Sequence, residues 1–248
     1  MQNTQFRLGV QSYCFRTYKT MPELMSAVKQ TELGYVEIWP GHLDYHSEWE
    51  AVDAGLGLLK EAGLEMEAYG AVSITADEKD MRRLMDFARR AGLRYLTVVR
   101  LDEAALPMAE ELSREYGVLF AEHNHGRRFR YGTFRELEEL FGKTSSAMGL
   151  CLDAAWFLDS GEDPLAAVDV FRDRLYGVHL KDFAFDEKGD HRDVIVGQGG
   201  LDLPRFVEKL EEIRFDGYMS LEYEGDEEDP IPSTLECLKE VRKVLPAG

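Results

Sequence analysis

Short runs of apolar and β-branched residues recur along the chain, and each follows a glycine, as in Gly34-Tyr35-Val36 and Gly117-Val118-Leu119. The runs start about 25 to 40 residues apart, which suits a parallel strand together with the crossover helix that must follow it. The pattern therefore predicts eight strand and helix units. Their starting glycines are Gly9, Gly34, Gly63, Gly92, Gly117, Gly149, Gly177 and Gly217.

The segments between these runs carry the residues that start helices. A hydroxyl residue followed three positions later by glutamate fits a capping box, and an aspartate shortly before proline fits an N-cap with proline in the first turn. Residues 80–90 also place their apolar side chains on one helical stripe. The predicted starts are Thr20 with Glu23, Thr133 with Glu136, Ser233 with Glu236, Asp163 with Pro164, and Asp202 with Pro204.

Strands and helices alternate along residues 1–248, and no Gly/Ser/Pro-rich linker interrupts them. This order predicts an α/β fold with a parallel sheet in a single domain. We expect a closed (β/α)8 TIM barrel over residues 1–248, with a doubly wound open sheet as the alternative. The longest interval, between Gly177 and Gly217, predicts an additional loop at residues 183–200.

Polar side chains gather where the predicted strands end. Barrel strands are buried on both faces, and the chemistry of a TIM barrel is carried by its carboxyl-terminal rim. The fifth strand ends in Glu122-His123-Asn124-His125, and the next three end near Asp153, His179 and Glu222. Because side chains alternate along a strand, His123 and His125 share one side, and Glu122 and Asn124 share the other.

If the histidine side faces the lumen, His123, Asp153, His179 and Glu222 converge on the barrel axis. Such a mixture of imidazole and carboxylate ligands suits a divalent metal ion (Mn²⁺, Zn²⁺, Co²⁺ or Mg²⁺) with positions left open for substrate oxygens. Each carboxylate alone also fits a helix cap, and His123 also fits a ring bonded to a rim carbonyl. The occurrence of three ligand types at consecutive strand ends favours the metal site.

The net charge narrows the possible partners. The chain has 47 acidic residues against 29 basic ones, a formal net charge of −18, and its densest basic stretch, residues 126–130, holds three arginines. A surface this acidic repels phosphodiester backbones and anionic lipids. We therefore expect no nucleic-acid partner and no membrane partner.

The cysteines and the N-terminus bear on the compartment. Cys14, Cys151 and Cys237 are isolated and odd in number, which argues against a disulfide framework and favours a reducing environment. Residues 1–5 lack the pattern of a signal peptide, and no window approaches 18 uninterrupted apolar residues. We expect a cytoplasmic protein; whether it forms a homo-oligomer is left open by the sequence.

In this order and spacing, the motifs resemble those of the sugar phosphate isomerase/epimerase superfamily, the xylose isomerase-like TIM barrels, over essentially the whole chain. The resemblance implies a divalent metal ion, a small-molecule carbohydrate substrate, and isomerase or epimerase chemistry through an enediolate. The matching elements are residues 9–16, Gly34-Tyr35-Val36-Glu37, Pro40-Gly41-His42, His123-Asn124-His125-Gly126, Leu152-Asp153, His179-Leu180-Lys181-Asp182, Gly197-Gln198-Gly199 and Glu222-Tyr223.

Members of that superfamily typically hold the metal with a glutamate, an aspartate, a histidine and a second glutamate. Asp153, His179 and Glu222 match this set, whereas His123 stands where the first glutamate is usual. The paired glutamates remove a proton from one face of the substrate and return it to the other. The expected function is a metal-dependent isomerase or epimerase. The loss of one glutamate makes a lyase or dehydratase reaction on a keto-sugar or inosose-like substrate the alternative, since β-elimination needs only one base.

Glu222 is the expected catalytic base, and we expect Lys181 or Glu37 to orient or protonate the substrate. Glu37 lies in an apolar run, where an unpaired carboxylate costs several kcal/mol. For Lys181 the alternative is an ion pair with Asp182 or with a neighbouring rim carboxylate.

We expect substrate contacts from Tyr13, His42 and His125, with stabilisation of a loop as the alternative for His42. The polar loops around His46 and His191 predict surface positions for both rings. Residues 224–229 are rich in acidic side chains, and we expect them to form a solvated loop.

Two other functions remain as alternatives. AP endonucleases share the barrel, but they need a histidine-rich zinc cluster and a basic DNA-binding face, whereas this chain has 6 histidines in all and a charge of −18. The second alternative is a catalytically degenerate barrel that binds a sugar without converting it, because function resides in the site and not in the fold.

Overall fold

The computed structural model describes residues 6–245. Within this range, eight parallel strands form a curled sheet in the order β2-β1-β10-β7-β6-β5-β4-β3. Isolated bridges, Tyr35 to Glu65 and Ile38 to Tyr69, connect β2 to the β3 side and bring the ends of the sheet together. The strands are β1 (Arg7–Gln11), β2 (Tyr35–Glu37), β3 (Ala68–Ile74), β4 (Tyr95–Leu101), β5 (Leu119–His123), β6 (Met148–Asp153), β7 (Leu175–Leu180) and β10 (Tyr218–Leu221).

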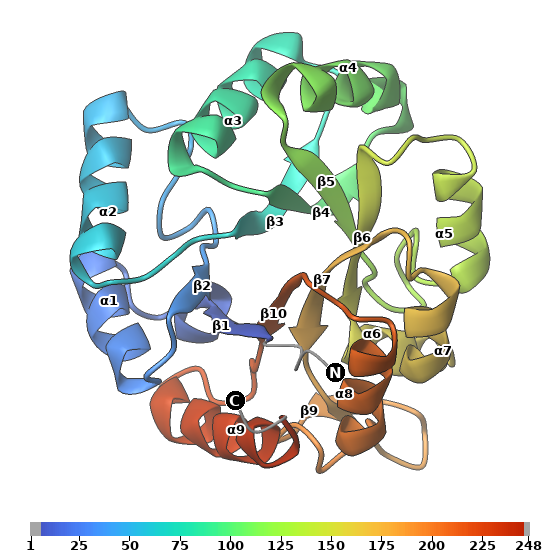
Figure 1. Cartoon of the computed structure of the whole chain (residues 1–248). Helices are drawn as coiled ribbons and strands as arrows, with labels where there is room; N and C mark the ends of the chain where they lie inside the picture. The colour runs from blue at the N-terminus through green and yellow to red at the C-terminus, as the bar shows by residue number, and fades with distance from the viewer. Residues whose placement is uncertain (1–5, 246–248) are drawn as a thin grey trace.

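Helices surround this sheet, as Figure 1 shows in a view into the barrel. The predicted (β/α)8 TIM barrel is therefore confirmed, and the doubly wound open sheet is wrong. The helices are α1 (Met21–Gln30), α2 (Trp49–Glu61), α3 (Glu78–Ala91), α4 (Leu106–Tyr116), α5 (Phe134–Phe141), α6 (Ala154–Asp159), α7 (Pro164–Val170), α8 (Leu203–Glu212) and α9 (Pro230–Val244), with 3-10 turns at Ser12–Phe15 and Glu103–Ala105.

Four of the five predicted helix starts are confirmed. Thr20 and Thr133 form complete capping boxes, and Asp163 and Asp202 accept backbone N–H groups at the starts of α7 and α8. The fifth is wrong: α9 begins at Pro230, so Ser233 lies inside the helix, where its hydroxyl donates to Asp226 instead of capping.

The lumen of the barrel is packed with aromatic side chains below the rim. Tyr95 and Tyr218 are fully buried there in a cluster with Cys151 and two alanines. Glycine is needed beside these rings, because a Cβ at Gly9 would collide with the Tyr218 hydroxyl and one at Gly177 with the Tyr95 hydroxyl. The lower lumen is thus a packed core, and open space is confined to the rim.

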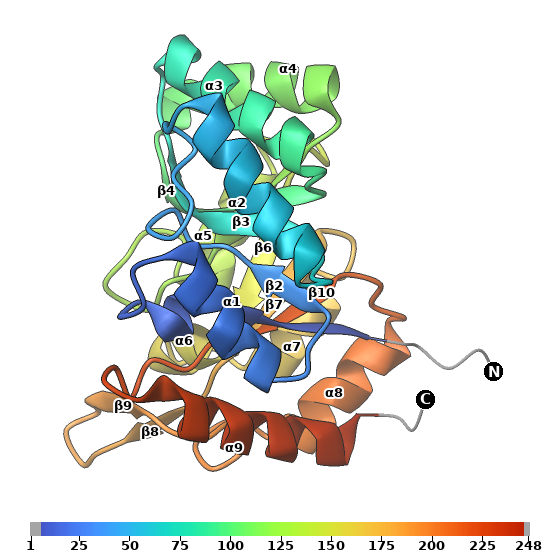
Figure 2. The ribbon, with the colours of Figure 1, turned by 90° about the vertical axis from the view of Figure 1, so that its left-hand side faces the viewer.

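The predicted loop at residues 183–200 carries a small antiparallel hairpin, β8 (Phe183–Phe185) with β9 (His191–Asp193). Figure 2 shows it on the side of the barrel where the parallel strands end. The Asp182 carboxylate accepts the N–H groups of Gly197, Gly199 and Leu201 at 2.8–3.0 Å, which holds the glycine-rich turn against the rim.

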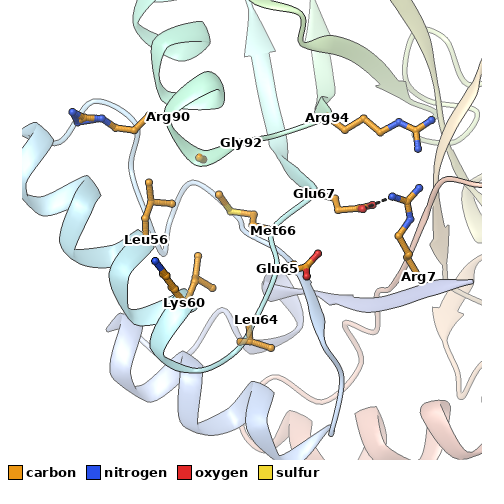
Figure 3. A pocket seen from close by; sticks show the side chains of 12 residues that line it. Arg7, Leu56, Lys60, Leu64, Glu65, Met66, Glu67, Arg90, Gly92 and Arg94 are labelled. Carbon is orange, nitrogen blue, oxygen red and sulfur yellow. Dashed lines mark hydrogen bonds and ion pairs between the residues drawn. The ribbon is translucent and has the colours of Figure 1, made fainter.

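A separate hollow of about 430 Å³ lies at the opposite end, where the strands begin. Figure 3 shows Arg7 and Arg94 there near Glu67, with Arg7 and Glu67 joined as an ion pair. Ion pairs at this end of a TIM barrel serve stability rather than chemistry. No helix in residues 6–245 is long and apolar enough to cross a membrane. The predicted absence of a signal peptide rests on residues 1–5, which lie outside the described residues.

Candidate active site

Four side chains from neighbouring strands meet at the rim. His123 ends β5, Asp153 ends β6, His179 lies in β7, and Glu222 directly follows β10. Each offers one ligand atom, and these atoms all lie within 4.8 Å of one another. All four side chains are buried. We call this group the rim cluster.

The strand register explains why these residues meet. Asp153 lies directly opposite His179 in the β6 and β7 pair, and Ser220 lies opposite His179 in the next pair. Glu222 follows Ser220 by two positions, so the alternation of side chains directs both to the same side. The histidine side of β5 faces the lumen, whereas the carboxylate of Glu122 is buried away from it and has no partner in the described chain.

Hydrogen-bonding capacity left unused in the rim cluster fits a bound cation. Three buried atoms have no hydrogen-bond partner within residues 6–245: the two ring nitrogens of His123 and Oδ2 of Asp153. Nε2 of His123 and Oδ2 of Asp153 lie 3.4 Å apart without the alignment of a hydrogen bond. Buried polar atoms rarely stay unpaired, and imidazole with carboxylate is a common donor set for divalent metals.

The other carboxylate oxygen of Asp153 is already hydrogen-bonded. Oδ1 accepts the Trp156 N–H at 2.9 Å and so caps α6. The Asn124 side chain bonds both the N–H and the carbonyl of Asp153, at 2.8 and 2.9 Å, which ties the end of β6 to β5. These bonds hold Asp153 with its free oxygen in the cluster.

His179 is held between two carboxylates. Its Nε2 lies 2.8 Å from Oε2 of Glu37, and its Nδ1 lies 3.2 Å from Oε2 of Glu222. Because a carboxylate only accepts, both ring nitrogens carry protons here, Nε2 donating to Glu37 and Nδ1 to Glu222. A bound cation would take the place of the proton on Nδ1, while Glu37 keeps the proton on Nε2. Burial lowers the pKa of His179, but Cys151, Glu37 and Glu222 outweigh it and raise the pKa well above its ordinary value.

Glu37 is fully buried behind this histidine. Its second oxygen, Oε1, accepts the Thr97 hydroxyl at 2.6 Å, so both carboxylate oxygens are bonded. Glu37 is not among the residues that line the rim cavity. The structure therefore shows Glu37 as a hydrogen-bond partner of His179, and its predicted catalytic role stays a prediction.

Lys181 is a buried cation beside the rim cluster. Its side chain is 2% exposed, and Nζ lies 3.8 Å from Oε2 of Glu222 and also pairs with Glu224. Burial lowers the pKa of Lys181, but Glu222, Glu224 and nearby aspartates outweigh it and raise the pKa. Burial conversely raises the pKa of Glu222, but Lys181 and His179 hold it well below its usual range. Asp182 is not the partner of Lys181, since it binds the glycine turn.

A cavity of about 500 Å³ opens above the rim cluster. His123, His179 and Glu222 form part of its wall, and the predicted contact residues Tyr13 and His125 lie in it as well. Asp153 and Lys181 are buried just behind the surface of the cavity. A space of this size suits a small ligand.

His125 presents a neutral ring to this cavity. Its ring stacks on Trp156 with the centroids 4.3 Å apart. Burial, with a further contribution from His123, lowers the pKa of His125 to about 4. At neutral pH the ring therefore offers one donor and one acceptor without charge.

His42 is buried in the loop after β2 and does not line the cavity. Nδ1 lies 3.0 Å from the Ser12 hydroxyl, and Nε2 lies 3.2 and 3.0 Å from the carbonyls of Phe15 and Tyr18. Both nitrogens are thus engaged within the loop. The geometry supports the alternative of loop stabilisation, while the substrate contact remains untested.

The His42→Ala variant is expected to lower the free energy of unfolding by about 1–3 kcal/mol at pH 8, because it leaves buried partners unpaired. Burial lowers the pKa of His42 from its ordinary 6.5, so below pH 6.5 the unfolded chain takes up a proton that the folded chain resists. Stability should therefore fall with pH less steeply in the variant. Urea unfolding at pH 8, 6 and 5 measures this, and equal slopes would contradict it.

Glu224 is a cavity residue that the sequence analysis missed. It was expected in a solvated acidic loop, but it lines the cavity, pairs with Lys181, and donates its N–H to Asp193 at 2.8 Å. Its spacing of two residues from Glu222 was the available signal. His191 is exposed, as predicted, and its Nδ1 lies 3.1 Å from the buried carboxylate of Asp159.

The family described as xylose isomerase-like TIM barrel matches residues 25–241. Among curated proteins, the rhizopine catabolism protein MocC of Rhizobium meliloti is 28% identical over 214 residues, which cover 79% of this chain and 64% of that protein. Inosose dehydratase of Lacticaseibacillus casei is 28% identical over 130 residues, 46% of this chain and 43% of that protein.

The chain therefore spans less than two thirds of either curated relative. Among solved structures, the probable 3-DHS dehydratase AsbF of Bacillus anthracis superposes with a TM-score of 0.75 at 17% identity, covering 97% of this chain and 98% of that one. At this identity the likeness concerns the fold alone.

Proposed function

The chain belongs to the xylose isomerase-like TIM barrel family, and on that premise we propose that it is a metal-dependent enzyme that removes the proton beside the carbonyl of a keto-sugar or keto-polyol and then eliminates water. Family members include sugar isomerases, epimerases and dehydratases. One observation carries the proposal: four buried ligand atoms of the rim cluster lie within 4.8 Å of one another beneath an open cavity.

His123, Asp153, His179 and Glu222 would hold the divalent cation. When bound, such a cation polarises a carbonyl oxygen and makes the adjacent C–H bond more acidic. Glu222 is the group expected to receive that proton, because its carboxylate lines the cavity beside the other three ligands and is ionised at neutral pH. The positive charge of Lys181, 3.8 Å from Glu222, offsets negative charge that develops on the substrate.

The groups that line the cavity favour elimination over epimerisation, in which one glutamate removes the proton from one face of the substrate and another returns it to the opposite face. Glu222 takes the proton from carbon, and the electron pair of the C–H bond forms a C=C bond as the C–O bond to the β-hydroxyl breaks. Glu222, now a carboxylic acid, returns the proton to the departing hydroxyl, which leaves as water. His123 and the neutral ring of His125 line the cavity, and by the family resemblance His123 stands where an epimerase would carry its other glutamate. The curated relative named inosose dehydratase is consistent with this reaction.

An isomerase or epimerase is the second candidate, and one observation favours it. Glu224 lies in the cavity wall two residues after Glu222, and burial raises its pKa although Lys181 opposes the shift. A carboxylate with a raised pKa is suited to exchange protons near neutral pH. This reaction shares proton removal with the dehydratase and differs in its product.

The test uses the full chain with Mn²⁺, Mg²⁺, Co²⁺ or Zn²⁺ in D₂O, with inosose and a panel of keto-hexoses. We expect deuterium at the carbon beside the carbonyl together with loss of one water, both followed by mass spectrometry. Deuterium exchange with a product of unchanged composition would favour the second candidate. No exchange with any substrate and ion would contradict both.

Glu37 is proposed as a positioning residue that fixes the tautomer of His179. Glu37→Gln should lower cation affinity about 10- to 100-fold, since partners that orient a metal ligand contribute this much. Thr97→Val is the matched control, because it removes the other hydrogen bond of the same carboxylate and should have a smaller effect. Calorimetric titration with Mn²⁺ measures both, and equal affinities in wild type and Glu37→Gln would show that Glu37 has no such role.

A further inference from the structure

A second, smaller hollow adjoins the rim cavity. The two share His125 and Trp156 in their walls. We call the smaller one the side hollow; it is lined by His125, Phe129, Trp156 and His191, with Arg127 and Asp159 at its edge. Its volume is about 150 Å³, and a protein cavity of about this size can hold benzene. The side hollow therefore has room for one six-membered ring beside the substrate site.

Aromatic faces form the walls of the side hollow. The ring of His125 stacks on Trp156, and Phe129 packs edge-on against His125 with the centroids 4.5 Å apart. Phe129 is nevertheless 50% exposed, which is the highest value among the exposed large hydrophobic side chains of residues 6–245. A large aromatic ring held at the mouth of a hollow suits contact with the flat face of a ligand ring.

Polar groups with unused hydrogen-bonding capacity accompany these faces. Nε1 of Trp156 and Nδ1 of His125 are buried and have no partner in the described part of the chain. His191 is fixed by its bond to Asp159 and by stacking on Phe183, with the centroids 4.2 Å apart and the planes at 10°. Its Nε2 makes no hydrogen bond to any residue between 6 and 245. These groups suit hydroxyl groups at the edge of a ring.

We propose that the side hollow binds a second, hydroxyl-bearing ring of the substrate, joined to the keto-sugar ring that lies above the rim cluster. The substrate class is then a keto-glycoside, whose second ring is either a sugar or a phenol. The balance of charge agrees with a neutral ring, since Arg127 and Arg128 in the wall are matched by Asp159 and Asp190. The assignment of the first ring rests on the proposed function.

The test compares one-ring and two-ring probes. Glucose, cellobiose and phenyl β-glucoside are titrated calorimetrically into the Mn²⁺-loaded full chain. We expect at least one two-ring probe to bind about 10-fold more tightly than glucose, and the tighter of the two identifies the second ring as sugar or phenol. Phe129→Ala should reduce this ratio to about 2 or less, and His191→Phe, which keeps the stack and loses the nitrogens, should reduce it in part.

Leu235→Ala is the matched control, because Leu235 is an exposed apolar residue of α9 that lines neither hollow; it should leave the ratio unchanged. Equal affinity for one-ring and two-ring probes, no binding of any probe, or an unchanged ratio in Phe129→Ala would overturn the proposal. Deuterium exchange on a monocyclic keto-sugar is measured alongside. Deuterium exchange without tighter binding of a two-ring probe would contradict the proposal for the side hollow alone. Tighter binding of a two-ring probe without deuterium exchange would contradict the proposed function.

Discussion

Glu222→Gln is expected to lower the rate of proton removal from the substrate by about 10²- to 10⁴-fold, the usual contribution of a general base. The amide keeps the shape of the side chain but cannot accept the proton. It also leaves Lys181, which is 2% exposed, with one carboxylate partner fewer. The rate is measured as deuterium incorporation beside the carbonyl at saturating Mn²⁺, so that a weaker cation site does not mimic a lost base.

Glu228→Gln provides the matched control for this variant. Glu228 is an exposed residue of the acidic loop, residues 224–229, that follows Glu222, and it lies outside the cavity wall. The rate of deuterium incorporation in Glu228→Gln should equal that of the wild type. An exchange rate in Glu222→Gln within about threefold of the wild type would assign the base to another group, with Glu224 the first to examine.

Asp153→Asn is expected to weaken divalent-cation binding by about 100-fold or more, which exceeds the usual effect of an outer partner of a metal ligand. Asparagine is as good an N-cap as aspartate, so α6 keeps its start while the free ligand oxygen loses its charge. In the wild type, a cation at 100 times its dissociation constant should add about 2.7 kcal/mol to the free energy of unfolding. The variant should show almost none of this stabilisation.

Asp163→Asn is the control for the structural part of this change, since Asp163 caps α7 in the same way, with a bond of 2.9 Å to the Leu165 N–H, away from the rim cluster. It should keep both the cation affinity and the cation-dependent stabilisation. Thermal unfolding with and without Mn²⁺, together with calorimetric titration, measures both quantities. Equal cation-dependent stabilisation in Asp153→Asn and the wild type would remove Asp153 from the metal site.

The barrel and the rim cluster could be predicted because both depend on local rules. The spacing of glycine-led runs predicts the strands, and parity along β5 separates His123 from Glu122 before any coordinates are known. Parallel strands then bring their carboxyl ends to one rim, which places Asp153 and His179 side by side. No knowledge of the loops is needed for this inference.

The supporting contacts could not be predicted, because they join strands that are distant in sequence. Glu37, Thr97 and His179 come from β2, β4 and β7, and their hydrogen bonds depend on how the closed barrel brings these strands together across the lumen. A buried carboxylate in an apolar run indicates that a partner exists, but the sequence does not say which one. The role expected for Glu37 was therefore catalytic, whereas the structure shows it bonded to a histidine.

The contacts of loop residues could not be predicted either, since turn geometry decides which groups a loop side chain contacts. His42 and Ser233 bond inside their own loop and helix start. Glu224 lies in the cavity wall, where its N–H donates to Asp193 of the hairpin formed by β8 and β9. The sequence predicted this hairpin only as an extra loop. Contacts between two loops are not encoded in the periodicity of either.

The most direct measurement of the central claim is an anomalous difference map from a crystal of this protein soaked in Mn²⁺. The account predicts a single strong peak between His123, Asp153, His179 and Glu222, with ligand atoms at about 2.0–2.3 Å. A map without a peak in the rim cluster, or a peak that Asp153 and His179 do not touch, would contradict it.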